Sequence, residues 1–119
     1  LDEEEALEYD CKALMIAKKL QDVESEARIL YDIATIFDKR KDCKAKDFYE
    51  RSMQLMDKNE RIYPLLMAHL FTLYTKSDPL FAIQFMMNIA VFHNSHLLFM
   101  RIWISFIYML VEISFPLCS

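Results

Sequence analysis

Apolar residues in the first 58 positions recur at steps of three and four, which is the spacing of one face of an α-helix. Three such stripes follow one another, and polar residues interrupt them at 21–25 and 39–42. The stripes predict three amphipathic helices joined by short turns, and therefore an all-α fold. Their members are Ala6, Tyr9, Ala13, Ile16, Ala17 and Leu20, then Ala27, Leu30, Ile33, Ala34 and Phe37, then Ala45, Phe48, Tyr49, Ser52, Met53 and Met56.

Polar residues at the breaks predict where these helices begin and end. Asp22, Ser25 and Asp42 can each cap a helix N-terminus, because a short polar side chain accepts from a main-chain N–H that has no helical partner. The chain contains no glycine. Helix C-termini therefore lack their usual left-handed residue, and Lys41 and Asn59 are the expected substitutes.

Small and large residues alternate on the facing stripes, which is typical of stacked helical repeats. Residues 27–57 resemble the tetratricopeptide repeat (TPR) family, with one helix carrying Leu30, Ile33, Ala34 and Phe37. The second helix of that repeat carries Ala45, Tyr49 and Ser52, and Asp42 lies in the turn. The opening segment is similar to the second helix of a preceding repeat. Its length resembles the longer repeats, of about 40 residues, of kinesin light chains and spindle-orientation adaptors.

The TPR resemblance implies a protein-interaction scaffold or adaptor that binds a peptide or helical segment of a partner protein. In that family one helix of each repeat lines a concave face. The residues of this chain that take those positions are Arg28, Tyr31, Thr35, Asp38 and Lys39. Tyr31 lies off the apolar stripe and is expected to be an exposed aromatic contact. Tyr31 and Thr35 stand where a carboxylate-binding clamp would need Lys or Asn, so no such clamp is expected.

The second half of the chain is chemically different from the first. Residues 1–63 carry 28 charged side chains, whereas residues 64–119 carry only four. Leu66, Leu70 and Leu73 keep helical spacing, and the segment 76–82 could form a turn. Three alternatives stay open for residues 64–119: a degenerate repeat over 59–92, a membrane segment, or an alternative carboxy terminus that replaces further repeats.

The last segment, 93–119, contains an apolar run. Residues 97–117 number 21, which is enough to cross a bilayer core, although Arg101 and Glu112 interrupt them. Burial of this segment, either as a capping helix or against a partner, is the favoured interpretation. A small membrane-anchored helical protein that uses 97–117 is the alternative function.

Composition argues against most other classes of function. The net charge is −4 and no Lys/Arg-rich run exists, which disfavours nucleic-acid binding. Glycine-rich phosphate loops are impossible without glycine. The three cysteines are widely spaced, as expected for thiols of a cytoplasmic protein. His93 and His96 lack a third metal ligand, and the acidic run 2–5 suits a solvated helix start. We therefore expect no enzyme, no metal and no cofactor.

Overall fold

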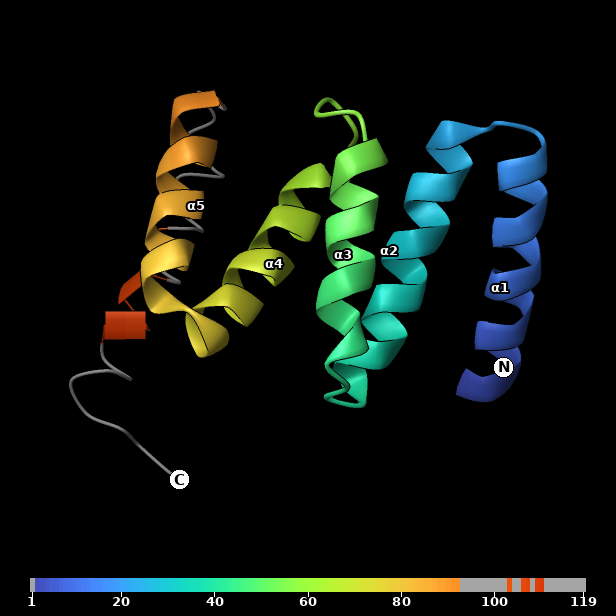
Figure 1. The fold of residues 1–119 in the computed structure, drawn as a ribbon, viewed down its shortest axis with the longest axis horizontal. Helices are drawn as coiled ribbons and strands as arrows, with labels where there is room; N and C mark the ends of the chain where they lie inside the picture. Colours follow the sequence, from blue (N-terminus) through green and yellow to red (C-terminus); the bar gives the residue numbers. More distant parts are fainter. Residues whose placement is uncertain (1, 93–102, 104–105, 108, 111–119) are drawn as a thin grey trace. The chain divides into compact units, whose positions relative to one another are not determined.

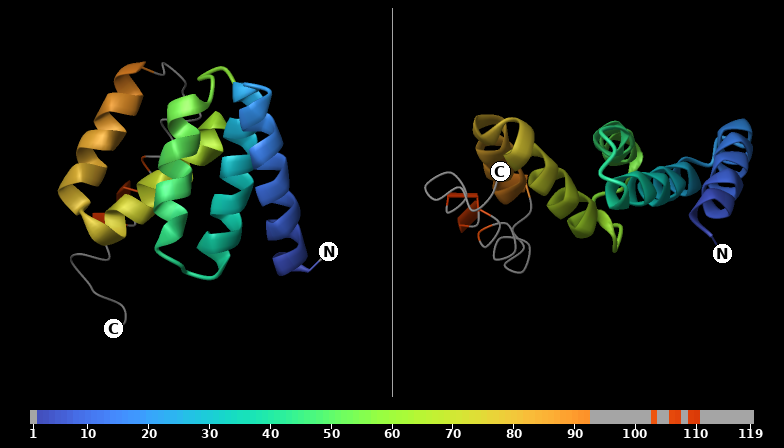
Figure 2. Two further views of the ribbon diagram at one scale, coloured as in Figure 1. Left: turned by 45° about the vertical axis from the view of Figure 1, so that its right-hand side comes forward. Right: turned by 90° about the horizontal axis from the view of Figure 1, so that it is seen from below.

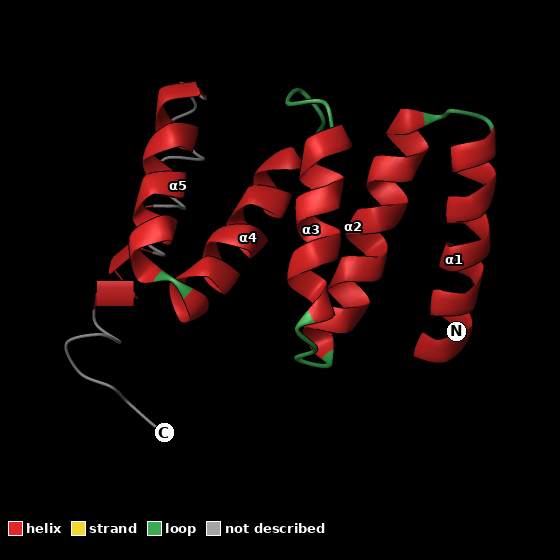
Figure 3. Ribbon diagram, in the orientation of Figure 1, coloured by secondary structure: helices red, strands yellow, loops and turns green. Residues whose placement is uncertain are grey.

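The computed structural model describes residues 2–92, 103, 106, 107, 109 and 110, and every regular element in this part of the chain is an α-helix (Figures 1 and 3). The prediction of an all-α fold is confirmed. The helices are α1 (Glu3–Lys19), α2 (Val23–Lys39), α3 (Lys44–Leu55), α4 (Tyr63–Ser77) and α5 (Pro79–Phe92). The chain divides into two compact units, Leu1–Leu66 and Met67–Ser119.

In the first unit, α2 lies between α1 and α3 and contacts both (Figures 1 and 2). Six of the seven residues expected to pack α2 against α3 are buried, and Phe37 is half-buried and stacks on Phe48 with ring centroids 5.4 Å apart. The fully buried Ser52 hydroxyl donates to the main-chain carbonyl of Ala27 at 2.7 Å. The apolar stripes of α2 and α3 therefore meet as their spacing predicts.

The apolar stripe of α1 is only partly covered. Ala17 is buried and Ala13 is half-buried, whereas Tyr9, Ile16 and Leu20 are exposed. The side of α1 that contacts α2 is a different side of the helix from the one that carries these large side chains. The predicted stripe of this helix is therefore wrong for its large members, whereas Leu7 and Leu14, which it leaves out, are half-buried.

The contact between α1 and α2 also brings two carboxylates together. Burial raises the pKa of Asp10. Burial, and after it the negative charge of Asp10, raises the pKa of Asp32. Both acids are thus more easily protonated than free aspartate, because the surroundings of each disfavour its charged form.

The two turns that flank α2 have the same geometry. Gln21 and Lys41 both have a φ of 55°, in the left-handed region that favours glycine. The Asp22 N–H donates to the Ala17 carbonyl, and the Asp42 N–H donates to the Phe37 carbonyl, both at 3.0 Å. With the additional bonds from the Gln21 and Lys41 N–H groups to Lys18 and Asp38, each turn is a Schellman motif built without glycine.

Side-chain caps begin the first helices. Asp2 accepts from the N–H groups of Glu4 and Glu5 at 2.7 and 3.3 Å, and Asp22 accepts from Ser25 at 3.1 Å. The hydrogen bonds from Ser25 lower the pKa of Asp22, because they stabilise its carboxylate. The prediction of Asp22 as an N-cap is confirmed. The prediction of Ser25 as an N-cap is wrong, because Ser25 lies inside α2. The Asp42 carboxylate accepts from the Lys44 N–H, but Asp42 lies one residue before Cys43, which is the N-cap residue of α3.

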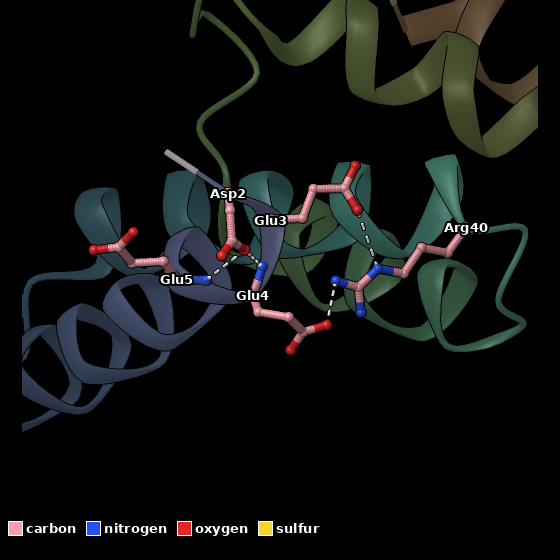
Figure 4. Close-up of polar contacts among 5 residues, drawn as sticks. All are labelled: Asp2, Glu3, Glu4, Glu5 and Arg40. Atoms are coloured by element: carbon pink, nitrogen blue, oxygen red, sulfur yellow. Dashed lines mark hydrogen bonds and ion pairs between the residues drawn. The ribbon is translucent and has the colours of Figure 1, made fainter.

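An ion-pair cluster ties the start of α1 to the end of α2. The Arg40 guanidinium contacts Glu3 at 3.2 Å and Glu4 at 2.6 Å (Figure 4). The hydrogen bond that Arg40 donates to Glu3, together with the charge of Glu4, raises the pKa of Arg40. Arg40 therefore joins the N-terminus of α1 to the C-terminus of α2, which are far apart along the chain.

After α3 the chain turns at 56–62. The expected end of the third helix at Asn59 is wrong, because α3 ends at Leu55 and the Asn59 N–H donates to Asp57 within the turn. Asp57 was therefore the stronger signal, since its side chain organises the main chain that follows.

In the second unit, α4 continues to Ser77 and α5 starts at Pro79. The Asp78 carboxylate accepts from the Phe81 N–H, as expected for a cap, and Pro79 takes the first helical position, where a missing N–H costs nothing. The Tyr74 ring meets the rings of Phe81 and Phe85 edge-on at 4.8 and 5.0 Å. The segment 76–82 thus contains a turn between two helices, as the sequence suggests.

No helix within the described residues is both long and apolar enough to cross a membrane. The predicted apolar helix at 93–119, including the 97–117 segment, lies largely outside the described residues. The HxxH pair at His93 and His96 lies outside them as well, as does Cys118.

Candidate functional site

The five residues expected to line a binding face all belong to α2 and follow one side of that helix. Arg28, Tyr31, Thr35, Asp38 and Lys39 are spaced by three, four, three and one residues, which keeps them within about 100° of arc. Arg28 and Lys39 are exposed near the two ends, and the three residues between them are half-buried. We call these five residues the α2 face.

Tyr31 is not the freely exposed aromatic that the sequence suggests. Its ring lies 5.9 Å from the ring of the fully buried Tyr49 in α3, at an angle of 57°. Burial, together with the charge of Asp32, raises the pKa of Tyr31. The tyrosine therefore contributes to packing while part of it remains at the surface, and this packing orients its ring before any ligand arrives.

Asp38 is held by the same tyrosine of α3. The Tyr49 hydroxyl donates to Asp38 Oδ2 at 3.0 Å. Burial first, and then the Asp38 charge, raises the pKa of Tyr49 strongly, because ionising the phenol would place a second negative charge beside the carboxylate. Tyr49 consequently positions Tyr31 through its ring and Asp38 through its hydroxyl.

Arg28 is oriented by two acids. Its guanidinium lies 3.0 Å from Glu24 on the same helix and 2.8 Å from Glu60, which is 32 residues away in the turn after α3. The hydrogen bond and charge of Glu60 raise the pKa of Arg28. Thr35 donates to the main-chain carbonyl of Asp32 at 2.7 Å, which fixes its hydroxyl.

A partly open cavity of about 300 Å³ lies beside Arg28, between the start of α2 and the end of α3. Its lining combines four apolar side chains with three acids and one arginine. Sequence reasoning missed this cavity, because it depends on Glu60 reaching α2 from a turn. Its lining residues are Val23, Glu24, Ala27, Arg28, Leu55, Met56, Asp57 and Glu60.

Among the described residues no group of three or more His, Cys, Asp or Glu side chains could hold a metal ion. Cys11 and Cys43 are free and exposed, and neither lies on the α2 face. What the face offers is a row of oriented polar groups and one aromatic ring, with a cavity at one end.

A family model described as "Protein of unknown function (DUF2989)" matches residues 5–83. The chain belongs to this family. The match covers the whole α2 face and continues to the first turn of α5, so the pattern of the DUF2989 family extends past Met67 into the charge-poor half. No curated protein and no solved structure matches the chain.

Proposed function

We propose that this DUF2989 chain is a protein-interaction scaffold, and that its α2 face binds an extended or helical segment of a partner protein. The main observation behind this proposal is that residues outside α2 hold the side chains of this face in place. Tyr49 positions Tyr31 and Asp38, and Glu60 positions Arg28. Groups that are already ordered lose less conformational entropy on binding, so such a face is suited to recognition.

The proposal includes a TPR-like architecture for α1 to α3. Two observations support it. The α2–α3 pair is packed by the small and large residues that carry the TPR resemblance, and Ser52 bonds to the α2 main chain. The first residues of α2 and α4, Val23 and Tyr63, are 40 residues apart, so one helix pair with its turns occupies 40 residues. A cytoplasmic location remains an expectation that accompanies this proposal.

The polarity of the face indicates which partner chemistry it would accept. Lys39 is exposed and has no ion pair with a described residue, so it can pair with an acidic side chain. At the other end, the cavity beside Arg28 can take an aliphatic side chain, because half of its lining residues are apolar. A partner segment with an acidic residue at one end and an aliphatic anchor at the other fits both ends.

Selection from a displayed library of random peptides against the full chain tests the proposal. The selected peptides should lose binding to Lys39→Glu and keep binding to Lys46→Glu, an equivalent charge reversal on an exposed lysine of α3. Far-UV circular dichroism checks that both variants remain helical. Selected peptides that bind both variants equally would place the binding surface elsewhere and refute the assignment of the α2 face.

A further inference from the structure

The exposed side of α1 carries a row of large apolar side chains. Tyr9, Ile16 and Leu20 are 57, 58 and 72% exposed. Their spacing of seven and four residues keeps the three within about 40° of arc around the helix. Exposed apolar side chains gathered on one side of a helix mark an interaction site more often than isolated exposed residues do.

This row is separate from the surface that α1 uses against α2. The buried Ala17 marks the α2 side, and Ile16 is rotated from it by about 100°. The row therefore remains available while α1 stays packed on α2. It also lies on a different helix from the α2 face, so the inference stands apart from the proposed function.

The charges beside the row comprise the Glu8–Lys12 ion pair at the middle of α1, with Lys12 5.8 Å from the Tyr9 ring centroid, and the charges at the two ends of the helix. The first turn contains Glu3, Glu4 and Glu5, and the last turn contains Lys18 and Lys19. Glu5 and Lys19 lie next to the row, and neither forms an ion pair with a described residue. An identical helix running in the opposite direction would bring the acidic end of each copy against the basic end of the other.

We propose that α1 pairs with α1 of a second copy of this chain in an antiparallel, two-fold symmetric contact. In this register Tyr9 faces Ile16 of the second copy, and Glu5 lies near Lys19 of the second copy. The symmetry repeats both contacts, so a single self-complementary surface completes the interface. A parallel arrangement is disfavoured because it would place acids against acids and lysines against lysines.

Sedimentation of the full chain over a range of concentrations tests the apolar part of the interface. The wild-type chain should show a monomer–dimer equilibrium. Ile16→Glu should weaken dimerisation about a hundredfold, because it places a charge in the centre of the apolar contact. Met15→Glu is the matched control: Met15 is 62% exposed but points about 100° away, so its dimer should remain.

Charge reversal tests the direction of the pairing. Glu5→Lys and Lys19→Glu should each weaken the dimer about two- to fivefold, whereas the double variant should restore it, since opposite charges then meet again. A parallel pair would gain nothing from the double reversal. A wild-type chain that stays monomeric, or a dimer that survives Ile16→Glu with unchanged helicity, would overturn the proposal.

Discussion

The Ser52 hydroxyl of α3 donates a hydrogen bond of 2.7 Å to the main-chain carbonyl of Ala27 in α2, and both residues are buried. The bond joins residues 25 positions apart and lets α3 approach the main chain of α2 closely. A larger residue at position 52 would separate the helices. The same close approach sets the distance at which Tyr49 reaches Tyr31 and Asp38.

Ser52→Ala should lower the free energy of unfolding by about 1–2 kcal/mol, because a buried hydrogen bond is lost while the close approach is kept. Ser52→Leu should cost more, because the extra volume forces the helices apart. Urea unfolding followed by circular dichroism measures both. Ser77→Ala, on an exposed residue, is the control and should change the midpoint little. Equal midpoints for Ser52→Ala and Ser77→Ala would contradict the role given to Ser52.

Glycine at either left-handed turn position should stabilise the chain. Gln21→Gly and Lys41→Gly should each raise the free energy of unfolding by about 0.5–1 kcal/mol, because φ near 55° strains a residue that has a Cβ. Lys18→Gly, inside α1, should instead lower it by about 0.5–1 kcal/mol. Urea midpoints measure all three variants. A loss of stability in both turn variants would show that these turns do not require a left-handed residue.

Tyr49 should make the fold sensitive to alkaline pH. Its pKa is higher in the folded chain than in the unfolded chain, so the stability it contributes is present below about pH 10. That stability falls as the pH rises further, because the unfolded state ionises first. The unfolding temperature of Tyr49→Phe should therefore fall less than that of the wild type between pH 9 and 11, which is the range about pH 10 in which a free tyrosine ionises. Tyr9→Phe, at an exposed ring, is the control and should decline like the wild type.

Asp32→Asn should stabilise the chain at neutral pH. The raised pKa of Asp32 means that the folded state disfavours its carboxylate, so ionisation costs stability once the pH exceeds the folded-state pKa. The amide removes that cost. Below about pH 4 both states of the wild type are protonated, and the advantage of the variant should vanish. Thermal unfolding at several pH values measures this, with Asp47→Asn as an exposed control. An advantage that persists in acid would point to packing rather than charge.

Local sequence signals accounted for most of the first unit. Helical spacing and polar breaks placed α2, and they identified the residues that pack it against α3, because each helix must bury its apolar stripe. Asp22 and Asp42 marked turns because their short side chains compete for free N–H groups. The same reasoning placed the turn at Asp78 in the charge-poor half.

The sequence by itself therefore determined the three helices of the first unit, the turns at Asp22 and Asp42 and the apolar stripes of α2 and α3, since all of these depend on residues within a few positions of one another. Only the tertiary structure decided which apolar sides are covered, and it left Tyr9, Ile16 and Leu20 exposed while it placed Tyr31 against Tyr49. It also brought Glu60 to Arg28 and opened the cavity beside them. These contacts depend on how helices and turns distant in the sequence pack together, and no periodicity along one helix contains that information.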